Sequence, residues 1–261
     1  MRQVVDQMGR RVAVPEVSKR IVSLVPSQTE LLYDLGLGDR IVGQTIFCIH
    51  PAEQFKQATK IGGTKKLQIQ KIIDLQPDLI IGNKEENEKS QIEELERHFP
   101  VWMSDITDLP QALQMIRGIG DICHKHQEAE KLIEDIENEF EKLVKKQPVK
   151  PMKTLYLIWK DPYMAAGADT FITDVLERAG FANAVETERY PELTEMELHR
   201  LSPELVLLSS EPYPFKEKHI NELQTMLPKA KLLLVDGEMF SWYGSRLLKT
   251  AEYLLRVKVV L

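Results

Sequence analysis

Short apolar runs that alternate with helical patterns constrain the fold of this chain more than any other feature. The first run, residues 20–25, is rich in β-branched side chains and stops at Pro26, as a buried strand should. Ser27 and Glu30 then stand at capping-box spacing ahead of an amphipathic segment that Gly36 ends. The opening pattern therefore predicts a strand that leads directly into a helix.

The same alternation continues to the end of the chain. Further apolar runs occupy residues 78–82, 153–159, 204–210 and 231–237, with helical patterns between them. These runs are apolar at nearly every position instead of every second one, which is typical of parallel strands buried on both faces. The sequence thus predicts an α/β fold with mainly parallel sheets.

Two distant stretches echo each other. "IQKIIDLQPDLIIGN" and "TEMELHRLSPELVLLSS" both read as a helix, then Leu-x-Pro-acid-Leu, then an apolar strand. The length of 261 residues also suits two lobes better than one. We therefore predict a Rossmann-like N-terminal lobe over residues 1–108 and a second such lobe over residues 148–261.

The segment between them, residues 109–147, reads as helix throughout. Apolar residues recur at helical spacing from Leu113 to Leu143, and no proline follows Pro110 until Pro148. A continuous helix of this length would measure roughly 55–60 Å. We expect one long connecting α-helix, weakest near Gly118 and Gly120.

Charge and patterning narrow the classes of partner. The net charge of −6 argues against a nucleic-acid-binding surface, and no apolar run approaches the roughly 20 residues of a membrane span. Polar residues interrupt every candidate signal core in "MRQVVDQMGRRVAVPEV". We expect a cytoplasmic protein if the chain is complete, and a periplasmic one if a signal peptide has been removed.

Four stretches, taken in order, resemble a known family. They are "RIVSLVPSQTELLYDLGLGDRIVG", "KIGGTKKLQIQKIIDLQPDLIIGN", the predicted long helix and "LSPELVLLSS". They are similar to the class III periplasmic binding proteins, or helical-backbone metal receptors, which bind cobalamin, siderophores or haem for ABC importers, and most of all to the cobalamin-binding branch. The resemblance implies a corrinoid, haem or metal chelate gripped in a cleft, without a covalent cofactor. Because no signal core is found, we expect a non-secreted relative of that family. The general rule for open α/β sheets also places a ligand beyond the carboxyl ends of the strands.

The resemblance also implies an ABC permease as partner, docked through one glutamate in each lobe. Seven residues before the proline of each Leu-x-Pro element stand Gln70 and Met196 instead. A neutral amide and a thioether would remove most electrostatic steering, so docking is expected to be weakened. Glu195 and Glu197 would compensate if the helix register were shifted.

Candidate ligand-binding residues of the first lobe follow its predicted strands. Amides near Ser27 would hold an anion, although simple capping explains that residue equally. Lys65 follows two glycines and would meet a carboxylate or phosphate. Glutamates in the loop after residue 83 belong to the site only if they face inward. The predicted set is Ser27, Gln28, Phe47, His50, Thr64, Lys65, Asn83, Glu85 and Glu86.

Aromatic-rich loops follow the predicted strands of the second lobe. "FSWYGSR", residues 240–246, is the densest. A single aromatic turn usually packs a core, but three such loops at successive strand ends favour a binding rim. Trp242 and Tyr243 would stack on a flat ligand, while Arg246 would clamp an acidic group or else pair with Glu238 or Asp236. The predicted set is Trp159, Tyr163, Glu211, Tyr213, Phe240, Trp242, Tyr243 and Arg246.

Metal ligation and catalysis are two further hypotheses for the candidate residues. Cys48 and His50 share one short turn and would coordinate a metal or give an axial ligand; an ordinary hydrogen bond from the histidine is the alternative. An enzyme acting on a small anionic substrate would use Glu85, Glu86, Glu211, His50, Lys65 and Arg246. The chain shows no nucleophile elbow, no strand-following G-x-G-x-x-G and no HExxH, so we expect a binding protein rather than an enzyme.

Overall fold

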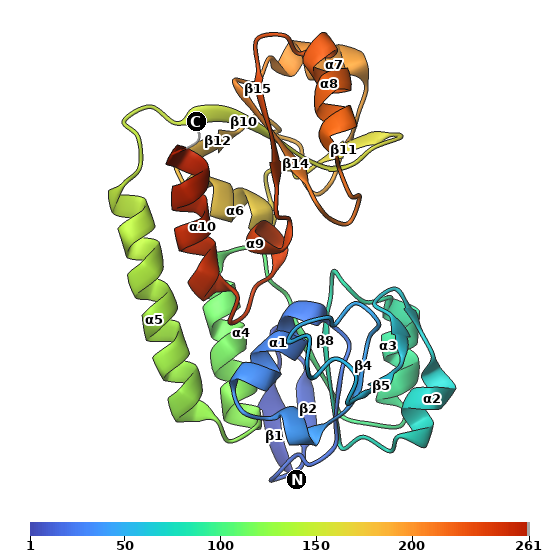
Figure 1. The fold of residues 1–261 in the computed structure, drawn as a ribbon. Coiled ribbons are helices and arrows are strands. Elements are labelled where there is room, and N and C mark those ends of the chain that lie inside the picture. Colours follow the sequence, from blue (N-terminus) through green and yellow to red (C-terminus); the bar gives the residue numbers. More distant parts are fainter. Residues whose placement is uncertain (260–261) are drawn as a thin grey trace. The chain divides into compact units, whose positions relative to one another are not determined.

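The computed structural model describes residues 1–259, and its contacts divide the chain into two compact units (Figure 1). The first unit, here called lobe 1, contains residues 1–106, 110–135 and 243–246. The second unit, lobe 2, contains residues 107–109, residues 136–242 and the described chain from residue 247 onward. The predicted two-lobe α/β fold is confirmed.

Lobe 1 is built on a five-stranded parallel sheet. Its order is β5-β4-β3-β8-β9, and every neighbouring pair is parallel. Each residue of β3, β8 and β9 is buried, as expected for strands covered on both faces. The strands are β3 (Ile21–Ser23), β4 (Ile41–Gln44), β5 (Thr59–Lys60), β8 (Leu79–Asn83) and β9 (Val101–Ser104). The helices are α1 (Pro26–Asp34), α2 (Ile69–Asp74), α3 (Lys89–Glu96), α4 (Leu109–Ile122) and the 3-10 turn Gly38–Arg40. Two hairpins complete it, β1–β2 (Arg2–Val5, Arg11–Val14) and β6–β7 (Gly62–Gly63, Lys66–Leu67).

Lobe 2 carries a mixed sheet of order β13-β11-β10-β14-β15, with β12 beside β10. The pairs β10–β12, β10–β14 and β14–β15 are parallel, while β11 pairs antiparallel with β10 and with β13. The strands are β10 (Met152–Trp159), β11 (Tyr163–Ala165), β12 (Phe181–Asn183), β13 (Glu192–Leu193), β14 (Leu205–Ser209) and β15 (Lys231–Val235). The helices are α6 (Phe171–Arg178), α7 (Glu195–Leu201), α8 (Glu217–Met226), α9 (Glu238–Ser241) and α10 (Leu247–Val259).

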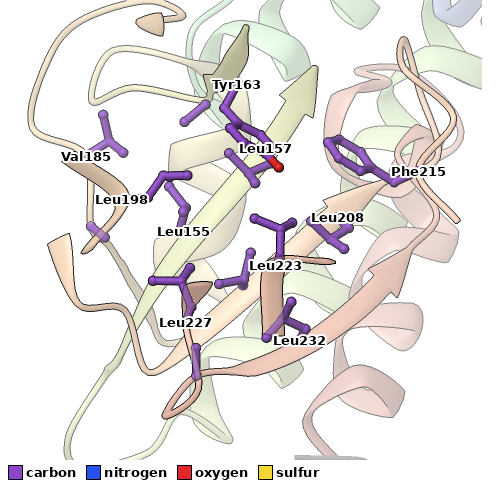
Figure 2. Packing of buried hydrophobic residues seen from close by; sticks show 14 residues of the cluster. Leu155, Leu157, Tyr163, Val185, Leu198, Leu208, Phe215, Leu223, Leu227 and Leu232 are labelled. Atoms are coloured by element: carbon purple, nitrogen blue, oxygen red, sulfur yellow. The ribbon is translucent and has the colours of Figure 1, made fainter. Parts of the chain in front are cut away.

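One face of the lobe 2 sheet packs a leucine-rich core. Because side chains alternate along a strand, Leu155 and Leu157 of β10 lie on the same face, where Leu208 of the neighbouring β14 joins them. Leu223 of α8 and Leu227, which follows the helix, cover this face (Figure 2). Burial of this cluster fixes α8 against the sheet.

The internal echo seen in the sequence is a repeated structural unit. Helix α2 leads into β8, and α7 leads into β14, each through a left-handed residue before proline: Gln76 with φ of 46° and Ser202 with φ of 45°. In lobe 1 the Asp78 carboxylate accepts hydrogen bonds from two backbone N–H groups that precede β3, at 2.8 and 3.0 Å. In lobe 2 Glu204 accepts from the Lys153 N–H of β10 at 2.9 Å. The acid after each proline therefore ties the unit to the neighbouring strand.

The start of α1 differs from the sequence prediction. Helix α1 begins at Pro26 without a side-chain cap, so Ser27 and Glu30 do not form the predicted capping box. Proline supplies the favourable backbone angle at the first position instead. At α6 a side-chain cap is present, because the Thr170 side chain accepts from the Thr173 N–H.

The predicted single connecting helix is two helices. Helix α4 ends at Ile122, and α5 (His126–Lys145) begins after His124, whose φ is 58°. The two pack as an antiparallel hairpin, because Arg117 and Glu130 form an ion pair at 2.5 Å and a side chain at Gly120 would collide with Ala129. The small residue permits this close approach, which the helical periodicity does not reveal. Residues 109–147 do not form a unit of their own. The part of α5 up to residue 135 belongs to lobe 1, and the part from residue 136 belongs to lobe 2.

Candidate ligand-binding site

The carboxyl ends of four parallel strands meet at one edge of lobe 1. Strands β3, β4, β8 and β9 end at Ser23, Gln44, Asn83 and Ser104. The loops that follow them carry nearly all the predicted residues of this lobe. This edge is therefore the candidate site of lobe 1.

Exposed apolar side chains distinguish the loop after β4. Ile46, Phe47 and Ile49 are 48%, 52% and 45% exposed. Gly63 lies under the Phe47 ring, where an added Cβ would stand 3.0 Å from the ring. The sequence prediction named Phe47 but missed both isoleucines, although apolar residues interrupting a loop were a usable signal. These three exposed apolar side chains of one loop are here called the apolar lip.

Cys48 and His50 lie in the same loop but in different environments. Cys48 is fully buried, and its Sγ lies 3.1 Å from the Thr29 Oγ1 and 3.0 Å from the Thr45 Oγ1. Burial raises the pKa of this thiol, whereas a metal ligand must be a thiolate. His50 is half-buried. Of the two predicted metal ligands, the geometry therefore disfavours Cys48.

The loop after β8 is organised by Asn83. The side-chain Oδ1 of this buried residue accepts from the Glu85 and Glu86 N–H groups at 2.8 and 3.0 Å. The Lys65 Nζ donates to the Glu85 carbonyl oxygen at 2.5 Å, and the Thr64 carbonyl accepts from Asn87 at 3.1 Å. Asn83 thus shapes the loop, while Lys65 is exposed at its margin and both glutamates are half-buried.

Helix α1 is braced from two sides. Gln28 is fully buried and donates to the Ser104 Oγ at 2.5 Å, which ties α1 to the end of β9. Arg246 donates from Nε and Nη2 to the two oxygens of Glu30, each at 2.8 Å. Both ionic side chains are buried, at 6% and 7% exposure. Glu30 is a partner that neither sequence reading of Arg246 named, and the arginine is engaged within lobe 1 rather than held open for a ligand.

The corresponding edge of lobe 2 lies at the ends of β10, β14 and β15. Trp159 ends β10 and is 39% exposed. Its ring meets Tyr213 edge-on, with centroids 5.6 Å apart and planes at 65°. Tyr213 is half-buried in the loop after β14. Of the aromatic residues predicted for lobe 2, these two remain accessible.

Three other predicted aromatic residues serve packing. Phe240 is fully buried between Tyr156 and Tyr253, with centroids 4.9 and 6.2 Å away. Tyr163 belongs to the lobe 2 core (Figure 2), where burial raises its pKa to about 12. Tyr243 is 6% exposed and belongs to the segment grouped with lobe 1. The dense aromatic pattern of residues 240–246 therefore includes side chains that pack inside the structure, and their contact with a ligand stays a prediction.

Glu211 holds the remaining part of that segment. Its Oε1 accepts from the Ser241 hydroxyl at 2.9 Å and from the Trp242 indole N–H at 3.0 Å. Burial raises the pKa of Glu211 and the nearby Glu238 raises it further, against the two hydrogen bonds. Trp242, which is 7% exposed, is thus fixed by a carboxylate of its own lobe.

Two features are absent from residues 1–259. No cluster of three or more His, Cys, Asp or Glu side chains is arranged to hold a metal ion in this part of the chain. None of the helices described there is long and apolar enough to cross a membrane.

Two α/β lobes with polar and aromatic loops at the carboxyl edges of their sheets define a solute-binding protein of the two-lobe class. Residues 21–223 match the periplasmic binding protein family, and the chain belongs to it. A curated relative, the vitamin B12-binding protein of Photorhabdus laumondii, is 23% identical over 90% of this chain and 86% of its own.

Two solved structures share this fold. The periplasmic vitamin B12-binding protein BtuF of Vibrio cholerae has a TM-score of 0.82 at 20% identity, covering 94% of this chain and 98% of that one. A periplasmic haem-binding protein from Pseudomonas aeruginosa has a TM-score of 0.81 at 23% identity, covering 92% of both chains. The class III fold expected from the sequence is confirmed.

Proposed function

We propose that this protein binds a corrinoid, haem or a related metal chelate through the carboxyl-edge loops of its lobes. The observation that carries the proposal is the exposure of large apolar side chains among polar loops at both edges: Phe47 in lobe 1 and Trp159 in lobe 2. Such side chains are suited to the apolar faces of a large planar ligand.

The polar surroundings suit the periphery of such a ligand. The exposed Lys65 ammonium complements a propionate or phosphate group, and Tyr213 offers a hydroxyl beside its ring. His50, next to the apolar lip, is the residue we propose as a single axial ligand to iron or cobalt, since a neutral imidazole suits both metals. The names of the relatives, which bind vitamin B12 or haem, support this ligand class.

A variant series tests the two proposed contacts. In titrations with cobinamide followed by visible absorbance, Phe47→Ala and Trp159→Ala should each weaken affinity by about tenfold or more, the cost of a buried aromatic contact. Met196→Ala is the matched control, because Met196 is an apolar side chain 80% exposed on α7. Equal affinities in all three variants would contradict the proposed site.

The enzyme alternative receives no comparable support. Glu211, one of the carboxylates it would use, already accepts two hydrogen bonds from its own lobe and is thereby assigned a structural contact. Catalysis remains a reading of the sequence alone.

We also propose that the protein docks on an ABC permease, with weaker electrostatic attraction than two docking glutamates would give. The Gln70 amide donates to the Asp74 carboxylate at 2.9 Å, and Met196 presents no charge. Glu197 is held in the capping box of α7 with Thr194, so the exposed Glu195 is the neighbouring carboxylate we propose for compensation. Affinity for the reconstituted permease should depend weakly on salt and strengthen in Met196→Glu. A steep salt dependence in the unmodified protein would contradict weakened steering.

The cellular compartment of the protein depends on whether the chain is cut from a longer precursor. We propose the cytoplasm for a chain made with these first residues, and the periplasm for one cut from a longer precursor. Fractionation of cells that express the natural gene, with mass measurement of the mature protein, separates these outcomes.

A further inference from the structure

His219 occupies the third position of α8 and is only 3% exposed. Its ring Nδ1 accepts from the Lys216 backbone N–H at 2.8 Å. In return, the backbone N–H of His219 donates to the Lys216 carbonyl oxygen at 2.8 Å. The imidazole therefore takes the part that Glu or Gln plays at this position of a helix start.

These contacts fix the protonation state of the ring. A backbone N–H can only donate, so Nδ1 must carry a lone pair and the proton must lie on Nε2. That Nε2 stands 3.2 Å from the Tyr213 hydroxyl oxygen, to which its N–H donates a hydrogen bond. A second proton on Nδ1 would set two N–H groups against each other and break the contact with Lys216.

A chain of ring contacts leads from His219 to the exposed edge of lobe 2. The centroid of the imidazole lies 5.4 Å from the ring centroids of Tyr213 and Phe215. The Tyr213 centroid in turn lies 5.6 Å from that of Trp159. The backbone N–H of Tyr213 also donates to the Ile158 carbonyl of β10 at 3.3 Å. His219 is thus one residue removed from the aromatic side chain that the proposed ligand would contact.

The charges around His219 favour its neutral form. Burial lowers its pKa first, and the ammonium groups of Lys160, Lys218 and Lys216 lower it further. Glu222 acts in the opposite sense, but its carboxylate is paired with Lys160 at 2.5 Å. Tyr213 contributes a hydroxyl group, whose oxygen lies 3.2 Å from Nε2. At neutral pH the helix start is therefore intact, and acid is needed to disturb it.

We propose that neutral His219 is a positioning residue for the Trp159–Tyr213 pair, and that acidification lowers ligand affinity through it. The second half rests on the proposed function, because it requires that Trp159 contact the ligand. The first half concerns the ligand-free protein alone. The two are therefore tested separately.

The positioning test uses the fluorescence of Trp159, taken as the difference between the unmodified protein and Trp159→Phe, from about pH 8 to about pH 5. The emission should shift on acidification. His219→Gln should abolish the shift, because glutamine accepts the same N–H without titrating. His199→Gln, at an exposed histidine of α7, should leave it unchanged. Tyr213→Phe keeps the ring and removes the hydroxyl, and should reduce the shift.

The affinity test uses cobinamide at both ends of this pH range. Between the two pH values the unmodified protein should lose about tenfold more affinity than His219→Gln loses, the worth of one hydrogen bond, because any effect of the proposed ligand His50 is common to both. A flat Trp159 signal in the unmodified protein, or the same acid response in His219→Gln, would overturn the proposal. If the Trp159 signal behaves as expected but cobinamide does not bind at any pH, the positioning role stands and the proposed ligand class fails.

Discussion

Replacing Arg246 with methionine should destabilise lobe 1. The Arg246–Glu30 pair makes two hydrogen bonds of 2.8 Å, and both side chains are less than a tenth exposed. Removing one partner leaves a buried charge without its counterpart, at a cost of about 3–5 kcal/mol. With a urea dependence of about 2 kcal/mol per molar, the unfolding midpoint should fall by about 1.5–2.5 M.

Urea unfolding followed by circular dichroism measures this effect. Glu30→Gln should lower the midpoint similarly, while the double variant Glu30→Met with Arg246→Met should regain most of the loss, because apolar side chains of similar length leave no unpaired charge. The control is Arg256→Met. It removes an ion pair with Glu252 whose side chains are 62% and 69% exposed, and such pairs contribute at most about 1 kcal/mol.

The opposite pattern would refute the structural role of Arg246. An Arg246→Met protein whose midpoint stays within about 0.5 M of the unmodified protein, but which no longer binds ligand, would show that this arginine clamps the ligand. That outcome would restore the sequence reading of "FSWYGSR" as a binding segment.

Three further outcomes are expected. Burial raises the pKa of Glu211, so the native state keeps this proton over a pH window in which the unfolded chain has released it. The free energy of unfolding should therefore fall as pH rises through that window. In urea titrations Glu211→Gln should flatten this slope, whereas Glu217→Gln, at an exposed residue, should not. Gly237→Ala should lower the melting temperature, at a cost of about 1–3 kcal/mol, because the new Cβ would collide with the Ser209 Oγ and lie 2.6 Å from the Glu211 Cγ. Burial raises the pKa of Cys48, so a thiol reagent should modify it only when urea opens lobe 1.

The parts of the fold that the sequence predicted correctly are those set by local patterns. Continuous apolar runs predicted parallel, doubly covered strands, and the all-buried β3, β8 and β9 confirm them. The Leu-x-Pro-acid echo predicted two similar lobes because the turn before each proline and the acid after it act on neighbouring residues and one adjacent strand.

The features that were missed depend on contacts between distant residues. Arg246 and Glu30 are 216 positions apart, and no periodicity links them. Helical spacing continues across His124 although the backbone reverses there, since the same apolar period serves one long helix or two packed against each other. Aromatic content alone did not separate Phe240, a core residue, from Trp159, which is exposed, because burial is decided by the tertiary fold.

The central claim is that this chain binds a tetrapyrrole or metal chelate. Its most direct test is a visible-absorbance titration of the ligand-free protein with cobinamide, cobalamin and haem in turn. We predict a saturable spectral shift with at least one of them at one ligand per chain, and its loss in the double variant Phe47→Ala with Trp159→Ala. A protein that shifts none of the three spectra at any concentration would contradict the claim.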